Sequence, residues 1–380
     1  MADTTLTRGK TTMPLTSSDV PEPDHDVALD VRGLSVHIPT DHGTVTAADD
    51  VTLTVRRNEV LGVVGETGSG KTVTCRAMLG LLPTARSTHE GSVGYPAAGV
   101  SEVLGVPPGK LRSLWGRYVA MIPQNPMTSL NPIRRIGAQV AEAVETHSSL
   151  PPAARRARVV ELMTMVGIPA PEKRLRDYPH QFSGGMLQRT LIAIALAGEP
   201  QLLIADEPTT ALDVIIQDQI LKLLLSLQRD NGLSLVLVSH DLSVVAQVCD
   251  RVAVMYAGQI VELAGVDEVL RSPKHPYTAA LLNSLPGAVP RQRPLTTIPG
   301  SPPHLIDLGS GCRFADRCAF AEPKCTRQPS ELADASASGH RVRCVRHQEI
   351  DLVAAAAKGE LESPALPSSA GVAAVEREVL

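Results

Sequence analysis

The segment 65–72, with the sequence GETGSGKT, constrains the fold of this chain more than any other feature. It fits the pattern G-x-x-x-x-G-K-[ST] and stands between an apolar run at 60–64 and a stretch of helical composition at 71–82. Glycines let a backbone wrap around phosphate groups, and successive N–H groups at a helix N-terminus favour an anion. We therefore expect nucleotide phosphates to be bound by Gly65, Glu66, Thr67, Gly68, Ser69, Gly70 and Lys71, with Thr72 as a Mg²⁺ ligand.

A second apolar run, at 202–205, ends in two carboxylates, Asp206 and Glu207. Carboxylates are costly to bury unless they face a metal ion or a reacting water molecule. We expect Asp206 to help hold Mg²⁺ and Glu207 to act as a general base, or to orient water, for attack on the γ-phosphate of ATP. A pair of carboxylates that cap the following helix is the alternative.

Three small residues, Ser183, Gly184 and Gly185, precede a helical stretch at 187–197. A helix N-terminus is a ready anion site, although simple helix capping is the alternative. Because the loop around Lys71 already holds one nucleotide, a second phosphate cradle would serve the nucleotide of a partner. The sequence therefore predicts a dimer with ATP at its interface.

Strand and helix patterns alternate along much of the chain, which predicts an α/β fold with parallel strands and right-handed crossovers. Alternating residues around 34–38 and 51–55 indicate half-exposed N-terminal strands, and the strand pattern fades across 111–198, which indicates a helical insertion.

At 380 residues the chain exceeds one typical domain. We expect the four regions to be a disordered N-terminus at 1–26, a nucleotide-binding domain at 27–282, a proline-rich linker with a cysteine-bearing module at 283–350, and a disordered tail at 351–380.

The composition of the chain limits where in the cell it can reside and which partners it can bind. No run approaches eighteen apolar residues, and the N-terminal segment lacks the apolar core of a signal peptide. The chain has 36 basic and 40 acidic residues, so its net charge is close to zero. The arginines at 155, 156 and 158 are typical of a solvated helix face, so we expect no nucleic-acid partner. A cytosolic chain is expected, in which cysteines are metal ligands or core residues more often than disulfides.

The order of the motifs resembles the ATP-binding subunit of an ABC transporter over about residues 27–282. The motifs are the phosphate loop, Gln124, FSGGM at 182–186, ADEP at 205–208, ALD at 211–213 and His240. The segments YPHQFSGGM, LLIADEPTTALDV, MIPQNPMTSLNP and HPYTAALL are similar to the oligopeptide/dipeptide importer branch. Met186, where most such proteins have glutamine, resembles the first of the two ATPase subunits of these importers.

The resemblance implies roles for four further residues. Gln124 would touch Mg²⁺ or the attacking water, His240 would contact the γ-phosphate, and Asp213 would cross the dimer interface. His42 stands where such domains usually stack an aromatic residue on adenine. The alternatives are a surface glutamine, a capping or core histidine, a helix cap and a solvated turn residue, respectively. Pro123 and Asn125 depart from the branch's usual neighbours of this glutamine.

The resemblance also implies an ATPase that couples ATP-driven dimer closure and hydrolysis to the uptake of short peptides. Its implied partners are a second ATPase subunit (a homologue or a second copy), two membrane permease subunits and an extracytoplasmic peptide-binding protein. The chain would be peripheral, on the cytoplasmic face of the cell membrane. A related cargo such as nickel complexes, or a soluble ABC ATPase outside transport, is the alternative.

Four cysteines, Cys312, Cys318, Cys325 and Cys344, stand in the arrangement C-x5-C-x6-C-x18-C. Thiolates in a small cytosolic segment indicate a metal staple, but the C-x-x-C pairs of usual zinc sites are absent. The resemblance implies a [4Fe–4S] cluster, with zinc or metal-free reduced cysteines as alternatives and a structural role favoured over a redox role. Cys75 and Cys249 match no ligand pattern and are expected in the core.

Overall fold

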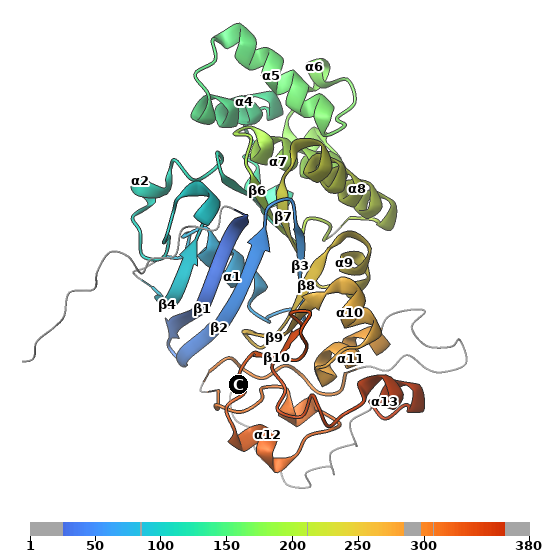
Figure 1. The fold of residues 1–380 in the computed structure, drawn as a ribbon. Coiled ribbons are helices and arrows are strands. Elements are labelled where there is room, and N and C mark those ends of the chain that lie inside the picture. The colour runs from blue at the N-terminus through green and yellow to red at the C-terminus, as the bar shows by residue number, and fades with distance from the viewer. Residues whose placement is uncertain (1–25, 84–85, 211, 285–297, 307, 362–380) are drawn as a thin grey trace, which may run out of the picture.

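The computed structural model describes residues 26–83, 86–210, 212–284, 298–306 and 308–361 of the chain. Within these ranges the chain forms two sheets with helices around them (Figure 1). The expected disordered N-terminus up to residue 25, residues 285–297 of the expected linker, and the end of the expected tail from residue 362 lie outside the described residues.

The smaller sheet is antiparallel, with strand order β2-β1-β4. Its strands are β1 (Val27–Thr40), β2 (Gly43–Arg56) and β4 (Thr88–Gly94). Buried residues alternate with exposed or half-buried ones along part of β2, as expected for a strand with one face on the core. The expected N-terminal strands at 34–38 and 51–55 are therefore confirmed.

The larger sheet has the order β10-β11-β9-β8-β3-β7-β6-β5. Parallel pairing joins β8 to β3, β3 to β7, β7 to β6 and β6 to β5. The strands are β3 (Val60–Val64), β5 (Val119–Ile122), β6 (Leu202–Asp206), β7 (Ser234–Ser239), β8 (Arg251–Tyr256), β9 (Gln259–Gly265), β10 (Ala333–Asp334) and β11 (Arg341–Val342). The central strands β3, β6 and β7 are buried throughout, which explains their continuous apolar sequences.

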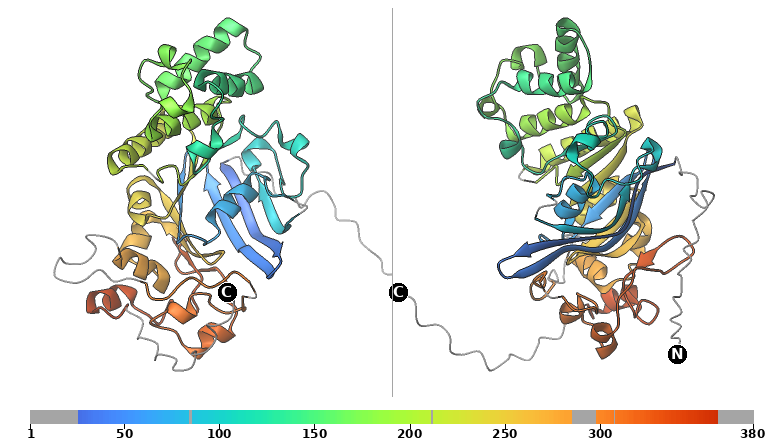
Figure 2. Two further views of the ribbon diagram at one scale, coloured as in Figure 1. Left: turned by 180° about the vertical axis from the view of Figure 1, so that it is seen from behind. Right: turned by 90° about the vertical axis from the view of Figure 1, so that its left-hand side faces the viewer.

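The described residues also form α-helices. They are α1 (Lys71–Met78), α2 (Pro108–Leu111), α3 (Pro126–Ser129), α4 (Ile136–His147), α5 (Pro152–Met165), α6 (Pro171–Arg174), α7 (Gly184–Leu196), α8 (Val214–Asn231), α9 (Leu242–Val248), α10 (Val266–Arg271), α11 (Pro276–Asn283), α12 (Pro323–Arg327) and α13 (Leu352–Lys358). In both views of Figure 2, α4, α5 and α6 (green) lie at one end of the molecule and α12 and α13 (orange to red) at the other.

The expected helical insertion at 111–198 contains a strand that the sequence analysis missed. Strand β5 pairs in parallel with β6 at the edge of the larger sheet. Only four residues, VAMI, form it, and so short an apolar run carries little strand pattern of its own. The helices α3 to α6 therefore begin after this strand, and the insertion is shorter than expected.

The segment after residue 298 is joined to the nucleotide-binding part of the chain by backbone pairing. Strand β11 pairs with β9 and extends the larger sheet. The expectation of a disordered tail from residue 351 is wrong for α13, which Asp351 caps through the N–H of Ala354. Leu352 and Ala355 of this helix pack in one apolar cluster with Ala279 of α11. Burial of this small apolar face keeps the helix in place.

Two arginines whose side chains are almost fully covered connect the same segment to β2. Arg313 donates to the carboxylate of Asp49 and to the carbonyl of Ala257. Arg343 donates to the carbonyls of Ile260 (3.0 Å) and Ser330 (2.6 Å) and to the Asp50 carboxylate (2.9 Å). These bonds satisfy guanidinium groups that would be costly to bury alone.

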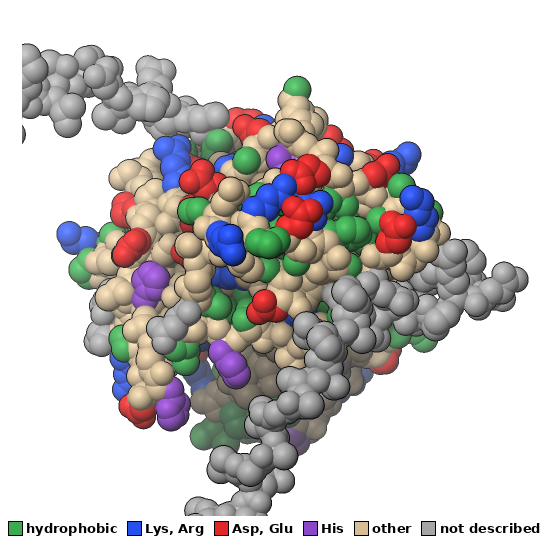
Figure 3. Space-filling model, turned by 90° about the horizontal axis from the view of Figure 1, so that it is seen from below, with side chains coloured by type: hydrophobic (Ala, Val, Ile, Leu, Met, Phe, Trp, Pro, Cys, Tyr) green, Lys and Arg blue, Asp and Glu red, His purple; other side chains and the backbone are tan. Residues whose placement is uncertain are grey.

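No helix in the described ranges has both the length and the apolar sequence to cross a membrane. Figure 3 views the molecule from the C-terminal end, and acidic and basic side chains are interspersed on the visible face.

We predict that Arg343→Ala lowers the free energy of unfolding by about 2–3 kcal/mol, because buried carbonyls and a carboxylate lose their donor. Denaturant unfolding of the full chain measures this change. Arg327→Ala, which removes an exposed arginine at the end of α12, is the control and should unfold as the wild type does. Equal stability of the two variants would contradict the structural role of Arg343.

Candidate functional site

The loop 65–70 connects the buried strand β3 to α1, as the sequence predicts. Gly70 has a φ of 95°, and a Cβ there would overlap the carbonyl oxygen of Ala47 in β2. A Cβ on Gly65 would overlap the carbonyl oxygen of Met255 in β8. Only glycine fits these two close approaches, so the loop is held against strands of both sheets.

Lys71 is the first residue of α1 and is 5% exposed. Its ammonium group donates to the carbonyls of Gly65 (2.8 Å) and Glu66 (2.9 Å) and lies 3.9 Å from the Glu207 carboxylate. Burial lowers the pKa of Lys71, and the charges of Glu207 and Asp206 oppose that shift. The loop's own carbonyls thus hold the ammonium where the sequence places nucleotide phosphates.

The two expected Mg²⁺ ligands Thr72 and Asp206 are in contact. The Thr72 hydroxyl donates to Asp206 Oδ1 at 3.2 Å. Asp206, at the end of β6, is 2% exposed, and burial raises the pKa of its carboxyl while the Thr72 hydrogen bond opposes the rise. A hydroxyl and a carboxylate side by side are the hard oxygen donors that Mg²⁺ prefers.

Glu207 lies in contact with the two other expected catalytic side chains, Gln124 and His240. One carboxylate oxygen accepts from Gln124 Nε2 at 2.9 Å and lies 3.5 Å from His240 Nδ1. The backbone of Glu207 is left-handed, with a φ of 48°, and its N–H donates to the carbonyl of Val238 in β7. A left-handed backbone is strained at a residue other than glycine, and such strain is common at functional sites.

Sequence reasoning missed Thr210, whose hydroxyl donates to the same Glu207 oxygen at 2.9 Å. The spacing of three residues in a turn was the available clue, since such spacing brings side chains together. It also missed two contacts of Glu66: its N–H donates to the Tyr277 hydroxyl (3.1 Å), and its carboxylate accepts from Arg317 (3.0 Å). Tyr277 and Arg317 are far from Glu66 in the sequence, so no local sequence pattern predicts these contacts.

The second expected phosphate cradle, at Ser183, Gly184 and Gly185, is formed at the start of α7 but is not part of the site around Lys71 in the same chain. Ser183 caps α7, accepting from the N–H of Met186 at 3.4 Å, and Asp213 caps α8, accepting from the N–H of Ile216 at 3.0 Å. Ser183 and Gly184 are exposed, whereas Gly185 is buried against Ile216. Among the described residues no hydrogen bond or ion pair connects either cap with Lys71, Asp206 or Glu207. Their role at a partner's nucleotide stays a prediction.

His42 is exposed in the turn between β1 and β2, where its N–H donates to the Thr40 hydroxyl at 3.4 Å. The structure describes no ring contact for it, so adenine stacking also stays a prediction.

The four C-terminal cysteines line one cavity, together with apolar residues that include Phe314 and Phe320. Burial raises the pKa of Cys318 to about 12 and that of Cys344 to about 11. Within the described residues, no group of three or more His, Cys, Asp or Glu side chains is placed to hold one metal ion. Cys75 is buried in one apolar core cluster, and Cys249 is half-buried against two others, in line with the core role expected for both.

Comparison with known proteins agrees with this geometry. Residues 48–210 match the ABC transporter family, and residues 261–325 match the C-terminal region of oligopeptide/dipeptide transporters. The chain is 44% identical over 331 residues to a probable peptide ABC transporter ATP-binding protein of Sinorhizobium fredii, covering 86% of this chain and 97% of that relative. It is 43% identical over 315 residues to the oligopeptide transport ATP-binding protein OppD of Salmonella typhimurium, covering 83% and 92%.

Among solved structures, the fold is similar to the dimeric ATP-binding cassette MJ0796 in a post-hydrolysis state with ADP and phosphate. The TM-score is 0.56 at 24% identity, covering 63% of this chain and 98% of that chain. At this identity the likeness supports the fold alone.

We predict that Gly70→Ala weakens ATP binding more than tenfold, because a methyl group at this position would overlap the Ala47 carbonyl and displace the loop. Gly68→Ala is the matched control: its φ of 83° is also positive, but a Cβ there meets nothing within 4 Å. It should cost only the backbone strain of about 1 kcal/mol. Titration with a fluorescent ATP analogue compares the two, and equal losses would contradict a requirement for close contact at Gly70.

Proposed function

Because this chain belongs to the ATP-binding subunits of oligopeptide and dipeptide ABC transporters, we propose that it is the ATPase that drives the import of short peptides. One observation carries the proposed chemistry: a single carboxylate, Glu207, contacts Gln124 and His240 and lies beside Lys71. These residues come from four separate parts of the chain, and the fold brings them together next to the phosphate loop.

The residues have distinct tasks in this proposal. Lys71 exchanges its bonds to the loop carbonyls for bonds to the β- and γ-phosphates of ATP. Thr72 and Asp206, with Gln124, would hold Mg²⁺, which neutralises phosphate charge. Glu207 orients the attacking water or accepts its proton, and His240 bonds to the γ-phosphate. The negative charge that develops during hydrolysis is met by donors already in place.

Two chains would close around two nucleotides. Ser183, Gly184, Gly185 and Asp213 would face the partner's ATP. The exposure of Val214 (79%) and Ile215 (72%), directly after Asp213, supports a contact at this surface, since apolar side chains of this size are usually covered. The partner is a second copy or a homologue, and Met186 favours the first subunit of such a pair.

Closure would move membrane permease subunits, with an extracytoplasmic protein delivering the peptide. The chain would then lie at the cytoplasmic face of the membrane as a peripheral subunit. The names of its relatives support oligopeptides and dipeptides as the cargo class.

We predict that Glu207→Gln lowers kcat at least about a hundredfold while ATP is still bound, because the amide cannot accept a proton. Glutamine keeps the shape and can still bond to Thr210. ATPase assays with size-exclusion chromatography measure turnover and the trapped closed dimer. Near-normal turnover would exclude the role of Glu207.

The four cysteines are proposed to hold a [4Fe–4S] cluster. Their chemistry fits: four thiols line one cavity, and thiolates are the ligands that hold iron–sulfur clusters. The cluster would supply folding energy to a segment with a small core of its own. Its proposed role is structural.

The purified full chain is expected to contain about four iron and four sulfide ions per molecule. Iron and sulfide analysis with absorption spectroscopy tests this. Cys318→Ser should lose iron, and Cys249→Ser, a cysteine outside the cavity, should keep it. Zinc in place of iron, or no metal at all, would contradict the cluster.

A further inference from the structure

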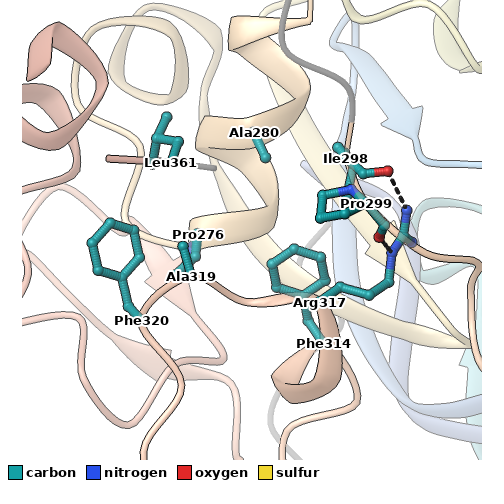
Figure 4. Close-up of a pocket in the computed structure, with 9 residues that line it drawn as sticks. All are labelled: Pro276, Ala280, Ile298, Pro299, Phe314, Arg317, Ala319, Phe320 and Leu361. Atoms are coloured by element: carbon teal, nitrogen blue, oxygen red, sulfur yellow. Dashed lines mark hydrogen bonds between the residues drawn. The ribbon is translucent and has the colours of Figure 1, made fainter. Parts of the chain in front are cut away.

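The cysteine-bearing segment touches the phosphate loop through Arg317. This side chain is 8% exposed although it lies in a segment far from the loop in sequence. Its Nε donates to the carbonyl of Pro299 (2.8 Å), and its Nη1 donates to Glu66 Oε2 (3.0 Å) and to the Tyr256 hydroxyl (3.2 Å). Figure 4 shows the guanidinium directed at the carbonyls of Ile298 and Pro299, beside the ring of Phe314. So many bonds leave the guanidinium little freedom to move.

Glu66 is the second residue of the phosphate loop, and its carboxylate is an unfavourable neighbour for a triphosphate. Its side chain is 24% exposed, so water screens it only in part. An unpaired carboxylate in this loop would repel a bound triphosphate by Coulomb's law. The buried Tyr277 hydroxyl holds the N–H of the same residue. The C-terminal half of the chain thus fixes Glu66 at both its backbone and its side chain.

We propose that Arg317 is a positioning residue for ATP binding: it neutralises the Glu66 carboxylate and holds it away from the phosphates. The proposal rests on the ATPase function proposed above. It gives the C-terminal segment a task in the nucleotide site of its own chain.

The position of Arg317 in the sequence connects its proposed role in ATP binding with the cysteine cavity. Arg317 directly precedes Cys318, just as Arg313 directly follows Cys312 and Arg343 directly precedes Cys344. The side chains of all three arginines are almost fully covered and reach into the nucleotide-binding part, whereas the cysteines beside them line the cavity. Because each arginine is adjacent to a cysteine that lines the cavity, the backbone around the cavity determines the position of all three arginines.

The decisive variant is Arg317→Gln in the full chain, tested by MgATP titration and by ATPase kinetics. We expect the Kd for MgATP, and the KM, to rise about three- to tenfold, because the negative charge of Glu66 near the phosphates is no longer offset. The kcat at saturating ATP should stay within about twofold of wild type, since the residues around Glu207 are untouched. An unchanged Kd would overturn the proposal.

A double variant separates charge from packing. In E66Q/R317Q both charges are gone, so the Kd should return to within about twofold of the wild-type value. If Arg317 acted only by packing on Pro299 and Tyr256, the double variant would bind as weakly as R317Q, and the proposal would fail. Arg341→Gln is the matched control, because Arg341 lies in the same segment beside a carboxylate, Asp334, away from the loop.

Two further results keep the test decisive. Should R317Q not fold, Glu66→Gln alone gives the answer: without the carboxylate, the positive charge of Arg317 near the loop is no longer offset by Glu66, and binding should tighten about two- to threefold. Weaker binding by E66Q would overturn the proposal. Failure of the wild-type chain to bind MgATP would instead refute the ATPase function, so the two failures are distinguishable.

Discussion

The buried ammonium of Lys71 is the charge around which the nucleotide site is organised. Taking it out of water is costly, and the chain compensates with two loop carbonyls and with the carboxylates of Glu207 and Asp206. These carboxylates lie at the end of β6, which β7 separates from β3, and all three parallel strands bring their carboxyl ends to one edge of the sheet. Glu207 in turn places Gln124 and His240. The geometry thus follows from one desolvated charge and from the direction of the strands.

A second buried charge joins the C-terminal segment to the same sheet. Glu262 in β9 is fully buried and accepts from the N–H groups of Lys274 and His275 (2.7 and 2.9 Å) and from His340 Nε2 (2.7 Å). It therefore anchors both the start of α11, which carries Tyr277, and the strand β11. With Arg313, Arg317 and Arg343 this carboxylate makes the cysteine-bearing segment part of the nucleotide-binding fold rather than an appendage.

The sequence was most informative where chemistry and local pattern coincide. The phosphate loop, the acidic end of β6 and the parallel strands around them are local, so eight residues or a continuous apolar run suffice to predict them. Strand β5 was missed because four residues show no clear period, and α13 because its alanine-rich composition resembles that of a tail despite its Asp351 cap. The contacts of Glu66 with Tyr277 and Arg317 could not be predicted, because they span 211 and 251 residues and depend on the packing of the whole chain.

The helix caps at Ser183 and Asp213 need not exclude a second role at a partner's nucleotide. The Ser183 oxygen accepts from Met186 N–H at 3.4 Å, which is long for a hydrogen bond, and the proton of its hydroxyl is not used by that bond. A capping serine can therefore still donate to a phosphate oxygen, while the helix N-terminus adds its own favourable potential. Capping keeps the cradle in shape within one chain, and the exposed position of Ser183 and Gly184 leaves it open to a second. The same local structure thus serves both the fold of the chain and its proposed assembly.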